Sequence, residues 1–324
     1  AIFTGGSMLY GSTGRTDLLG SEHTDELTHA QYHSVRRIAA ELAAEVEVYP
    51  THGFGSFCAA TPTSGDSSTI GEQQQSNPAL TQDEHTYVDE LIAGLSAYPA
   101  YYAHMGVINT KGPAPIDLSM PEPVDPDELR RRIDAGQWVV DLRARTAFAA
   151  GHVDGSLGFE LSTSFVTYLG WLYQWGVPLT LIGETTDQIA EATRELARIG
   201  IDSPSGSAVG EIHSLVGDGK VRSYDVSDFA GLAAATGERE ISVLDARQQS
   251  EYADSHLPGA VNIPLHELPH RLEEVSAAEV WVHCASGYRA SIAASLLDRE
   301  HRTVVLIDDD YEHAVQLGLH TSPA

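Results

Sequence analysis

The sequence predicts an α/β protein whose sheets are mostly parallel and covered by helices on both faces. Three observations lead to this fold class. Short apolar stretches alternate with helical stretches, one strand-and-turn pattern occurs twice, and runs rich in proline or glycine divide the 324 residues into three parts. A composition of 42% hydrophobic and 20% charged residues is typical of a globular chain. We expect domains at residues 1–115, 124–203 and 220–324.

The two boundaries follow from residues that interrupt regular structure. Residues 112–126 contain five prolines and predict a stiff connector that neither a helix nor a strand can cross. A helix is expected directly after it at 127–134, because proline precedes it and acidic residues fill its first turn. The second boundary is expected at 201–219, which is polar and contains proline and several glycines.

A comparison of the second and third parts predicts an internal repeat. Residues 137–143 read Gln-Trp-Val-Val-Asp-Leu-Arg, and residues 241–247 read Ile-Ser-Val-Leu-Asp-Ala-Arg. The same offset pairs Phe148 with Tyr252, His152 with His256 and Gly155 with Gly259. Agreement at one offset indicates two copies of one unit.

The remaining elements are placed by apolar runs. Residues 139–140 and 243–244 are expected to be strands, and the apolar stretch 165–175 a core helix. In the second copy we expect a strand at 280–283, a helix at 291–300 and a strand at 303–307. No window approaches the roughly 18 uninterrupted apolar residues of a membrane span.

The chemistry is expected in the loop that follows the strand at 280–283. It reads Cys284, Ala285, Ser286, Gly287, Tyr288, Arg289. Backbone N–H groups of a short loop and the N-terminus of the next helix favour an anion there, and the arginine adds a permanent cation. We predict that the cysteine is a nucleophilic thiolate, with the residues between it and the arginine binding substrate. The alternative is a small buried apolar residue, as for most free cysteines.

These residues show a resemblance to the rhodanese family. Its landmarks in the second copy are Asp245-Ala246-Arg247, Glu251-Tyr252, the run 256–264 and the six-residue span from Cys284 to Arg289. That span has the length of sulfur-transferring members, whereas phosphatase-like relatives have a longer loop. The resemblance implies that Cys284 takes sulfane sulfur from thiosulfate or a small persulfide and passes it to a thiol or cyanide, with no cofactor.

The first copy resembles the same family but lacks its reactive loop. After the expected strand the chain reads Gly183-Glu184-Thr185-Thr186-Asp187-Gln188, with neither cysteine nor arginine. We therefore expect 124–203 to be a rhodanese-like domain without catalysis. Scaffold roles, namely hydrogen bonds that hold turns and strands, are expected for Asp141, Arg143 and His152, and for Asp245, Arg247 and His256.

Residues 1–115 resemble the C-terminal part of the metallo-β-lactamase αββα fold. The resemblance rests on residues 3–10 and 14–18, and on 49–55, where His52 lies in a turn after an apolar strand at 46–49. Residues 97–112 resemble the persulfide-dioxygenase branch, and proteins that join this branch to rhodanese repeats form a fusion family similar to the whole chain. We expect the chain, which begins at Ala1 without methionine, to be N-terminally incomplete.

This resemblance implies an iron or zinc site, but the sequence departs from the family's pattern of metal ligands. His52 matches the last histidine ligand of the family, whereas the family's His-x-His-x-Asp-His motif is missing and Gly6 stands where relatives have aspartate. A metal site needs three or more protein ligands. Iron or zinc is therefore expected only if an upstream motif supplies the others. His29 and His33, spaced as neighbours on one helix face, are expected to be an exposed face rather than a metal pair.

Charge and cysteine content limit the partners. The chain has 19 Lys+Arg and 46 Asp+Glu, a net charge of −27, which argues against nucleic acid and anionic membrane. Its two cysteines, Cys58 and Cys284, do not suggest a disulfide framework, so a cytoplasmic location is expected. The sequence assigns Cys58 no role and leaves the oligomeric state open, a homo-oligomer included.

Three functions other than sulfur transfer stay open at this point. One is a metal-dependent persulfide dioxygenase or thioester hydrolase, with the rhodanese part relaying sulfur. Another is a non-catalytic persulfide or redox sensor that is modified at Cys284 but does not turn over. A site for arsenate or a phosphate ester is disfavoured by the length of the loop.

Overall fold

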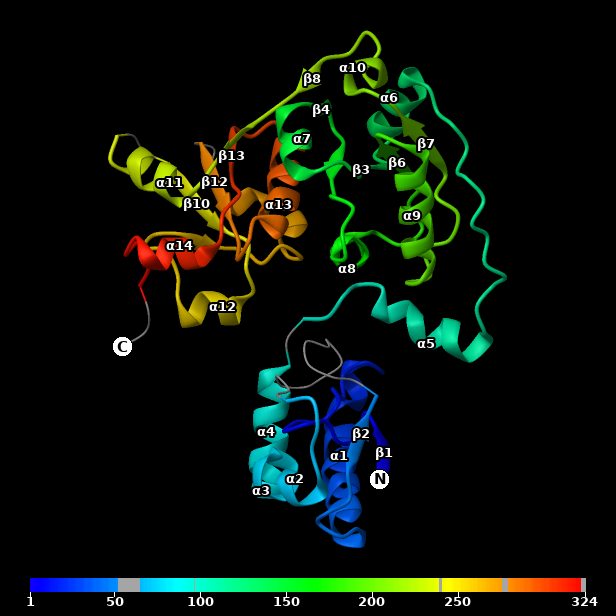
Figure 1. Ribbon diagram of the computed structural model, residues 1–324, viewed down its shortest axis with the longest axis vertical. Coiled ribbons are helices and arrows are strands. Elements are labelled where there is room, and N and C mark those ends of the chain that lie inside the picture. Colours follow the sequence, from blue (N-terminus) through cyan, green and yellow to red (C-terminus); the bar gives the residue numbers. More distant parts are fainter. Residues whose placement is uncertain (52–64, 96, 239–240, 276–278, 322–324) are drawn as a thin grey trace. The chain divides into compact units, whose positions relative to one another are not determined.

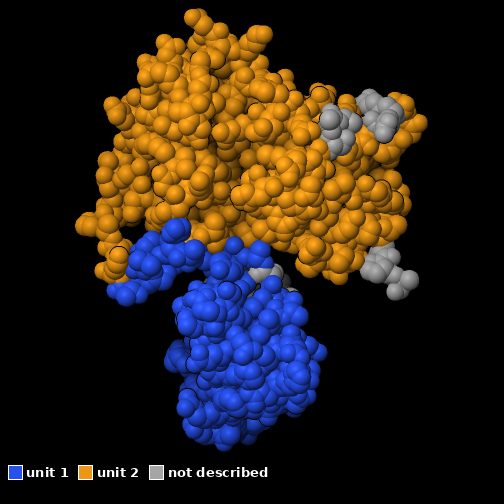
Figure 2. All heavy atoms as spheres, turned by 180° about the vertical axis from the view of Figure 1, so that it is seen from behind, with its two compact units in different colours: residues 1–98, 102–110 blue, residues 99–101, 111–324 orange. Residues whose placement is uncertain are grey.

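The protein is described by a computed structural model that covers residues 1–51, 65–95, 97–238, 241–275 and 279–321. It divides into two compact units, residues 1–98 with 102–110 and residues 99–101 with 111–324 (Figures 1 and 2). The division falls beside the proline-rich connector. We describe each unit by itself.

The first unit packs helices beside a short two-stranded parallel sheet. The strands are β1 (Ile2–Gly5) and β2 (Val48–Pro50), and the helices are α1 (Ser21–Glu41), α2 (Ile70–Ser76), α3 (Pro78–Thr81), α4 (Glu84–Gly94) and α5 (Tyr102–Lys111). Its core contains Met8, Val35, Ile70 and Tyr87, all nearly inaccessible. The strand expected at 46–49 begins two residues later.

The second unit contains a four-stranded parallel sheet in the order β5-β3-β6-β7 (Figure 1). Its elements are α6 (Pro126–Asp134), β3 (Trp138–Asp141), α7 (Arg145–Ala150), β5 (Leu157–Gly158), α8 (Phe165–Leu172), β6 (Leu179–Gly183), α9 (Thr186–Ala197), β7 (Gly206–Val209) and α10 (Ile212–Leu215). β7 lies beyond residue 203, where we expected this copy to end. Its Gly-Ser-Ala-Val sequence is too short and too weakly apolar to read as a strand; pairing with β6 stabilises it.

A five-stranded parallel sheet follows, in the order β11-β10-β12-β13-β9. Its elements are β9 (Asp225–Ser227), α11 (Phe229–Thr236), β10 (Ser242–Asp245), α12 (Gln249–Asp254), β11 (Val261–Asn262), β12 (Val280–His283), α13 (Tyr288–Arg299), β13 (Val304–Ile307) and α14 (Tyr311–Gln316), with 3-10 turns at Leu268–His270 and Leu272–Glu274. The order matches the first sheet strand for strand, and a parallel bridge from Pro123 to Ser207 occupies the position of β9 there. The predicted class, α/β with mostly parallel sheets, is confirmed.

The two sheets of this unit share one apolar core, to which both copies contribute. α13 contacts β12 and β13 of its own sheet and β5 of the other, so residues 290–298 are buried on every side of the helix. An antiparallel pair, β4 (His152–Val153) with β8 (Val221–Arg222), ties the segment between the copies to the first copy. The copies therefore form one folding unit, a feature that residue patterns within each copy do not predict.

Candidate active site

The cysteine loop occupies the end of β12 and the start of α13. Cys284 follows the strand directly and is 1% exposed. The helix begins at Tyr288, three residues before the expected start, because Gly287 adopts a left-handed conformation with φ 83° and turns the chain into it. No side chain caps this helix end. Its first backbone N–H groups have no acceptor within the helix, so they can bind an anion at the loop.

Two contacts hold the loop against the next strand end. The N–H of Tyr311 donates to the carbonyl of Ala285 at 2.8 Å. A Cβ atom added at Gly287 would lie 2.1 Å from an oxygen of Asp308, so only glycine allows this approach. Ser286, at the tip, is exposed. Backbone contacts thus hold the first part of the loop, whereas the side chains of Tyr288 and Arg289 at its end form bonds of their own.

The structure gives Arg289 a partner that the sequence did not suggest. Its guanidinium forms two bonds to the carboxylate of Glu251, at 2.5 and 2.8 Å. Glu251 lies in α12, where its carboxylate also accepts the N–H of Gln248 at 2.9 Å as part of a capping box. The permanent cation that the sequence predicts at the loop is therefore shared with a carboxylate.

The charges in this pair depend on each other. Burial disfavours the ionised carboxylate, but the hydrogen bond and charge of Arg289 outweigh it and lower the pKa of Glu251 below its usual range. Burial also disfavours charge on Arg289, yet Glu251 and the nearby Cys284 sulfur raise the pKa of its guanidinium. The charge of Arg289 thus interacts with the Cys284 sulfur as well as with Glu251.

The expected scaffold residues form matching contacts in the two copies. Arg143 bonds Asp141 at 2.7 Å and Arg247 bonds Asp245 at 2.6 Å, all four buried. Each arginine also donates, at 2.7 Å, to the backbone carbonyl of the residue eight positions later in the chain. In the second copy the guanidinium lies 3.7 Å above the ring of Tyr311, which connects this pair to the cysteine loop.

The paired histidines share one local contact and differ in a second. His152 and His256 each bond the carbonyl four residues earlier through Nδ1, at 2.8 and 2.9 Å, and each stacks on the aromatic ring of that residue. Of the two histidines, His152 makes a second contact: its Nε2 lies 3.0 Å from the carboxylate of Asp298, in the other copy. Burial raises the pKa of Asp298, but His152 and Arg222 outweigh it and lower that pKa overall.

The first copy has no anion-binding loop at the corresponding position. Only Glu184 and Thr185 separate β6 from α9, whereas four residues separate β12 from α13. The side chain of Thr185 also accepts the N–H of Gln188, which closes the helix end with a capping box. The helix terminus that would hold an anion is thus already satisfied by its own residues.

The first copy nevertheless contributes residues beside the cysteine loop of the second. Tyr288 donates its hydroxyl to the carbonyl of Glu160 at 2.7 Å, and the ring of Tyr168 lies 5.5 Å from that of Tyr288. Arg145 bonds Asp308 at 2.6 Å and Glu160 at 2.8 Å. Burial raises the pKa of Tyr168, and the charges of Arg289, Cys284 and Glu251 act on it. No motif marks these residues, because the contacts arise only when the two sheets pack.

The histidines of the first unit do not assemble a metal site in the described part of the chain. His29 and His33 both reach the carboxylate of Glu84, at 2.7 and 3.0 Å, on an exposed face of α1. No group of three or more His, Cys, Asp or Glu among the described residues is arranged to hold a metal. Gly6 has open space where a side chain would stand. His52 and Cys58 lie outside the described residues.

Comparison with known proteins identifies the class of the C-terminal part. Residues 229–315 match the family model described as Rhodanese-like domain. The chain is 34% identical over 64 residues to the putative sulfur carrier protein YrkF of Bacillus subtilis, covering 19% of this chain and 35% of that protein. It is 34% identical over 73 residues to the HTH-type transcriptional regulator Rv0324 of Mycobacterium tuberculosis, covering 22% and 32%. The chain thus spans about a third of the length of these relatives.

A solved structure resembles a larger share of the chain. A metallo-beta-lactamase from Staphylococcus aureus superposes with a TM-score of 0.54 and 27% identity, over 64% of this chain and 58% of that one. The protein therefore combines a rhodanese-like domain at its C-terminus with a structural likeness to a metallo-β-lactamase. Among its described helices, none has both the length and the apolar character needed to cross a membrane.

Proposed function

We propose that residues 220–324 form a sulfurtransferase domain that carries sulfane sulfur as a persulfide on Cys284. The observation that carries this proposal is the placement of a buried cysteine between a strand end and the uncapped N-terminus of α13. The match of residues 229–315 to the rhodanese-like model supports it. So does the similarity to a relative whose name describes a sulfur carrier.

The proposed reaction has two displacement steps. The Cys284 thiolate attacks the outer sulfur of thiosulfate, the sulfur–sulfur bond breaks, and sulfite leaves with the bonding electrons. The resulting persulfide anion is held by the loop N–H groups and the positive end of α13. A nucleophilic acceptor, a thiol or cyanide, then attacks the terminal sulfur and regenerates the thiolate.

Arg289 and Glu251 have linked roles in this scheme. The arginine stabilises negative charge on Cys284 and on the persulfide, while the carboxylate fixes the orientation of the guanidinium and reduces its field at the sulfur. Ala285, Ser286, Gly287 and Tyr288 form the binding loop. Asp245, Arg247 and His256 support it from the strand side.

The first copy acts as a non-catalytic rhodanese-like partner. Its Tyr168 lies beside the ring of Tyr288, and no described residue takes a hydrogen bond from its hydroxyl. Because burial raises its pKa, this phenol keeps its proton and can donate to an anionic substrate. Tyr168 is therefore the residue through which the first copy contacts the donor.

Donor and acceptor are small molecules in this proposal. A thiol that is 1% exposed admits thiosulfate or a low-molecular-weight persulfide more readily than a protein side chain. Neither a cofactor nor a nucleic acid or membrane is required. A thiolate nucleophile needs a reducing compartment, so we place the protein in the cytoplasm.

Sulfur transfer is tested by mass spectrometry and by product release. The full chain, incubated with thiosulfate, is expected to gain the mass of one sulfur atom on the peptide containing Cys284 and to release thiocyanate when cyanide is added. Cys284→Ser should lose both signals, and Cys58→Ser should keep both. No added sulfur on the intact protein would refute the proposal, while stable modification without thiocyanate would favour the sensor function.

Iron or zinc chemistry is not part of this proposal. The described residues of the first unit contain no converging set of ligands, and Gly6 cannot supply one. We therefore derive no step of a dioxygenase or hydrolase, although the metallo-β-lactamase likeness keeps such an activity as the alternative. Metal analysis of the purified chain tests it: stoichiometric iron or zinc would restore the alternative.

A further inference from the structure

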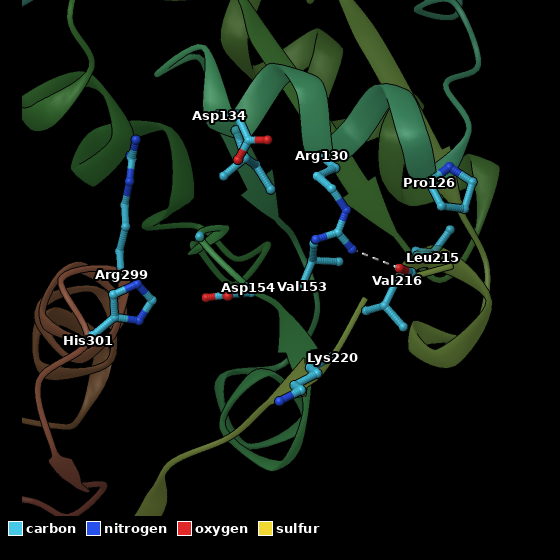
Figure 3. Close-up of a pocket in the computed structure, with 12 residues that line it drawn as sticks. Pro126, Arg130, Asp134, Val153, Asp154, Leu215, Val216, Lys220, Arg299 and His301 are labelled. Carbon is cyan, nitrogen blue, oxygen red and sulfur yellow. Dashed lines mark hydrogen bonds between the residues drawn. The ribbon is translucent and has the colours of Figure 1, made fainter. Parts of the chain in front are cut away.

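A cavity of about 200 Å³ lies between the two copies at the far end of α13 from the cysteine loop. Its lining comes from α6, from the turn after β4, from the segment before β8 and from the end of α13 (Figure 3). Cys284 precedes the first turn of this 12-residue helix, whereas Arg299 is its last residue. A helix of that length extends about 18 Å, so the cavity and the thiol are separate places.

Basic side chains line this cavity, although the chain as a whole is acidic. Arg130, Lys220 and Arg299 line it, although the protein has 46 acidic and only 19 basic residues. Figure 3 shows Arg130 on α6, Lys220 directly before β8 and Arg299 at the end of α13, on different sides of the cavity. Arg130 bonds a carbonyl, that of Val216 at 3.3 Å, so its charge is not neutralised. Within the described chain, Lys220 and Arg299 form no ion pair.

A histidine adds a neutral donor. The guanidinium of Arg222 lies 3.2 Å from Nδ1 of His301, which lines the cavity. Because arginine can only donate, Nδ1 must accept this bond and Nε2 must carry the ring hydrogen. His301 also has a left-handed backbone with φ 56°, which is rare outside glycine.

The acidic residues at the cavity do not cancel this charge. Asp154 faces Arg222 at 3.5 Å, and Arg222 is itself bonded to Asp298 at 2.7 Å. Asp134 is the remaining carboxylate in the lining. Arg222 and the three lining cations make four positive charges, and the three aspartates make three negative charges. The region of the cavity therefore has an excess of one positive charge, in a chain whose net charge is −27. The partial negative charge at the end of α13 is offset by Arg299 in its last turn.

We propose that this cavity binds a tetrahedral oxyanion of the phosphate or sulfate type, either free or as the end group of a larger molecule. Two guanidinium groups, an ammonium and an imidazole N–H supply the donors that such an anion requires. The cavity is large enough for the anion and accompanying water. Binding of the anion does not require an ion pair of the lining side chains to break. The site lies apart from the thiol and does not depend on sulfur transfer.

Calorimetric titration of the full chain at constant ionic strength tests this site. The probes are inorganic phosphate, which enters whole, and a nucleoside monophosphate, which leaves its base outside. Saturable binding of both supports the site, and the tighter probe distinguishes a free ion from an end group. Lys220→Gln and Arg299→Gln are each expected to weaken binding about fivefold, the upper limit for one exposed ion contact.

Matched controls separate a site from a general charge effect. Lys111→Gln and Arg194→Gln remove the same charges from exposed positions away from the cavity and should leave binding unchanged. Cys284→Ser should also bind normally, whether or not sulfur transfer occurs. The proposal is overturned if neither probe binds up to about 10 mM, if the controls weaken binding equally, or if Cys284→Ser abolishes it.

Discussion

Replacing Glu251 by glutamine tests the ion pair that Glu251 forms with Arg289 in the cysteine loop. The change removes the negative charge but preserves the size of a side chain that contacts Arg289 at 2.5 and 2.8 Å. The arginine side chain is 12% exposed and that of the glutamate 35%, so the pair lies between a surface pair, worth about 0–1 kcal/mol, and a fully buried one, which costs about 3–5 kcal/mol to break. We expect Glu251→Gln to reduce the free energy of unfolding by about 2 kcal/mol.

The pH dependence of this loss has a definite sign. The folded-state pKa of Glu251 is below the ordinary value of 4.5, so its contribution to stability is present above that pH and disappears as pH falls through the lowered value. Urea unfolding near neutral pH should show the full difference between wild type and Glu251→Gln, and unfolding in acid a smaller one. An equal difference at both pH values would refute the reasoning.

The same substitution should make Cys284 react faster at a fixed neutral pH. Without the carboxylate, the field of Arg289 acts on the sulfur undivided and favours the nucleophilic thiolate, so the rate of alkylation by iodoacetamide should rise several-fold. Arg289→Gln removes the cation and should lower this rate. Rate changes in the same direction would show that the pair does not control the thiol.

Three other residues give simpler expectations. Gly287→Ala should cost more stability than Gly259→Ala, by about 1–3 kcal/mol in urea unfolding, since both glycines have positive φ but only the first faces a carboxylate oxygen, 2.1 Å from the added Cβ. His152→Ala should destabilise the unit by about 2–3 kcal/mol, and a normal unfolding midpoint would exclude its bond across the copies. Tyr168→Phe should raise KM for thiosulfate several-fold at unchanged stability; an unchanged KM would remove it from the site.

The sequence was informative wherever a property is local. The alternation of strands and helices, the repeated Asp-x-Arg motif and the helix behind Pro126 follow from spacing and from residue preferences along a few consecutive residues, and the structure contains them. The position of Cys284 between a strand and a helix N-terminus was predictable for the same reason. β7 was missed because its strand character comes from the neighbouring strand rather than from its own side chains.

The sequence alone determined the fold class, the cysteine loop of the second copy and the absence of that loop from the first. Only the tertiary structure decided what surrounds the loop: the carboxylate of Glu251 on Arg289, the approach of Tyr168, and the bond from His152 to Asp298. These contacts join residues distant along the chain, and no pattern within one element encodes them. They depend on how two parallel sheets pack around α13, a helix buried on all sides because both sheets cover it.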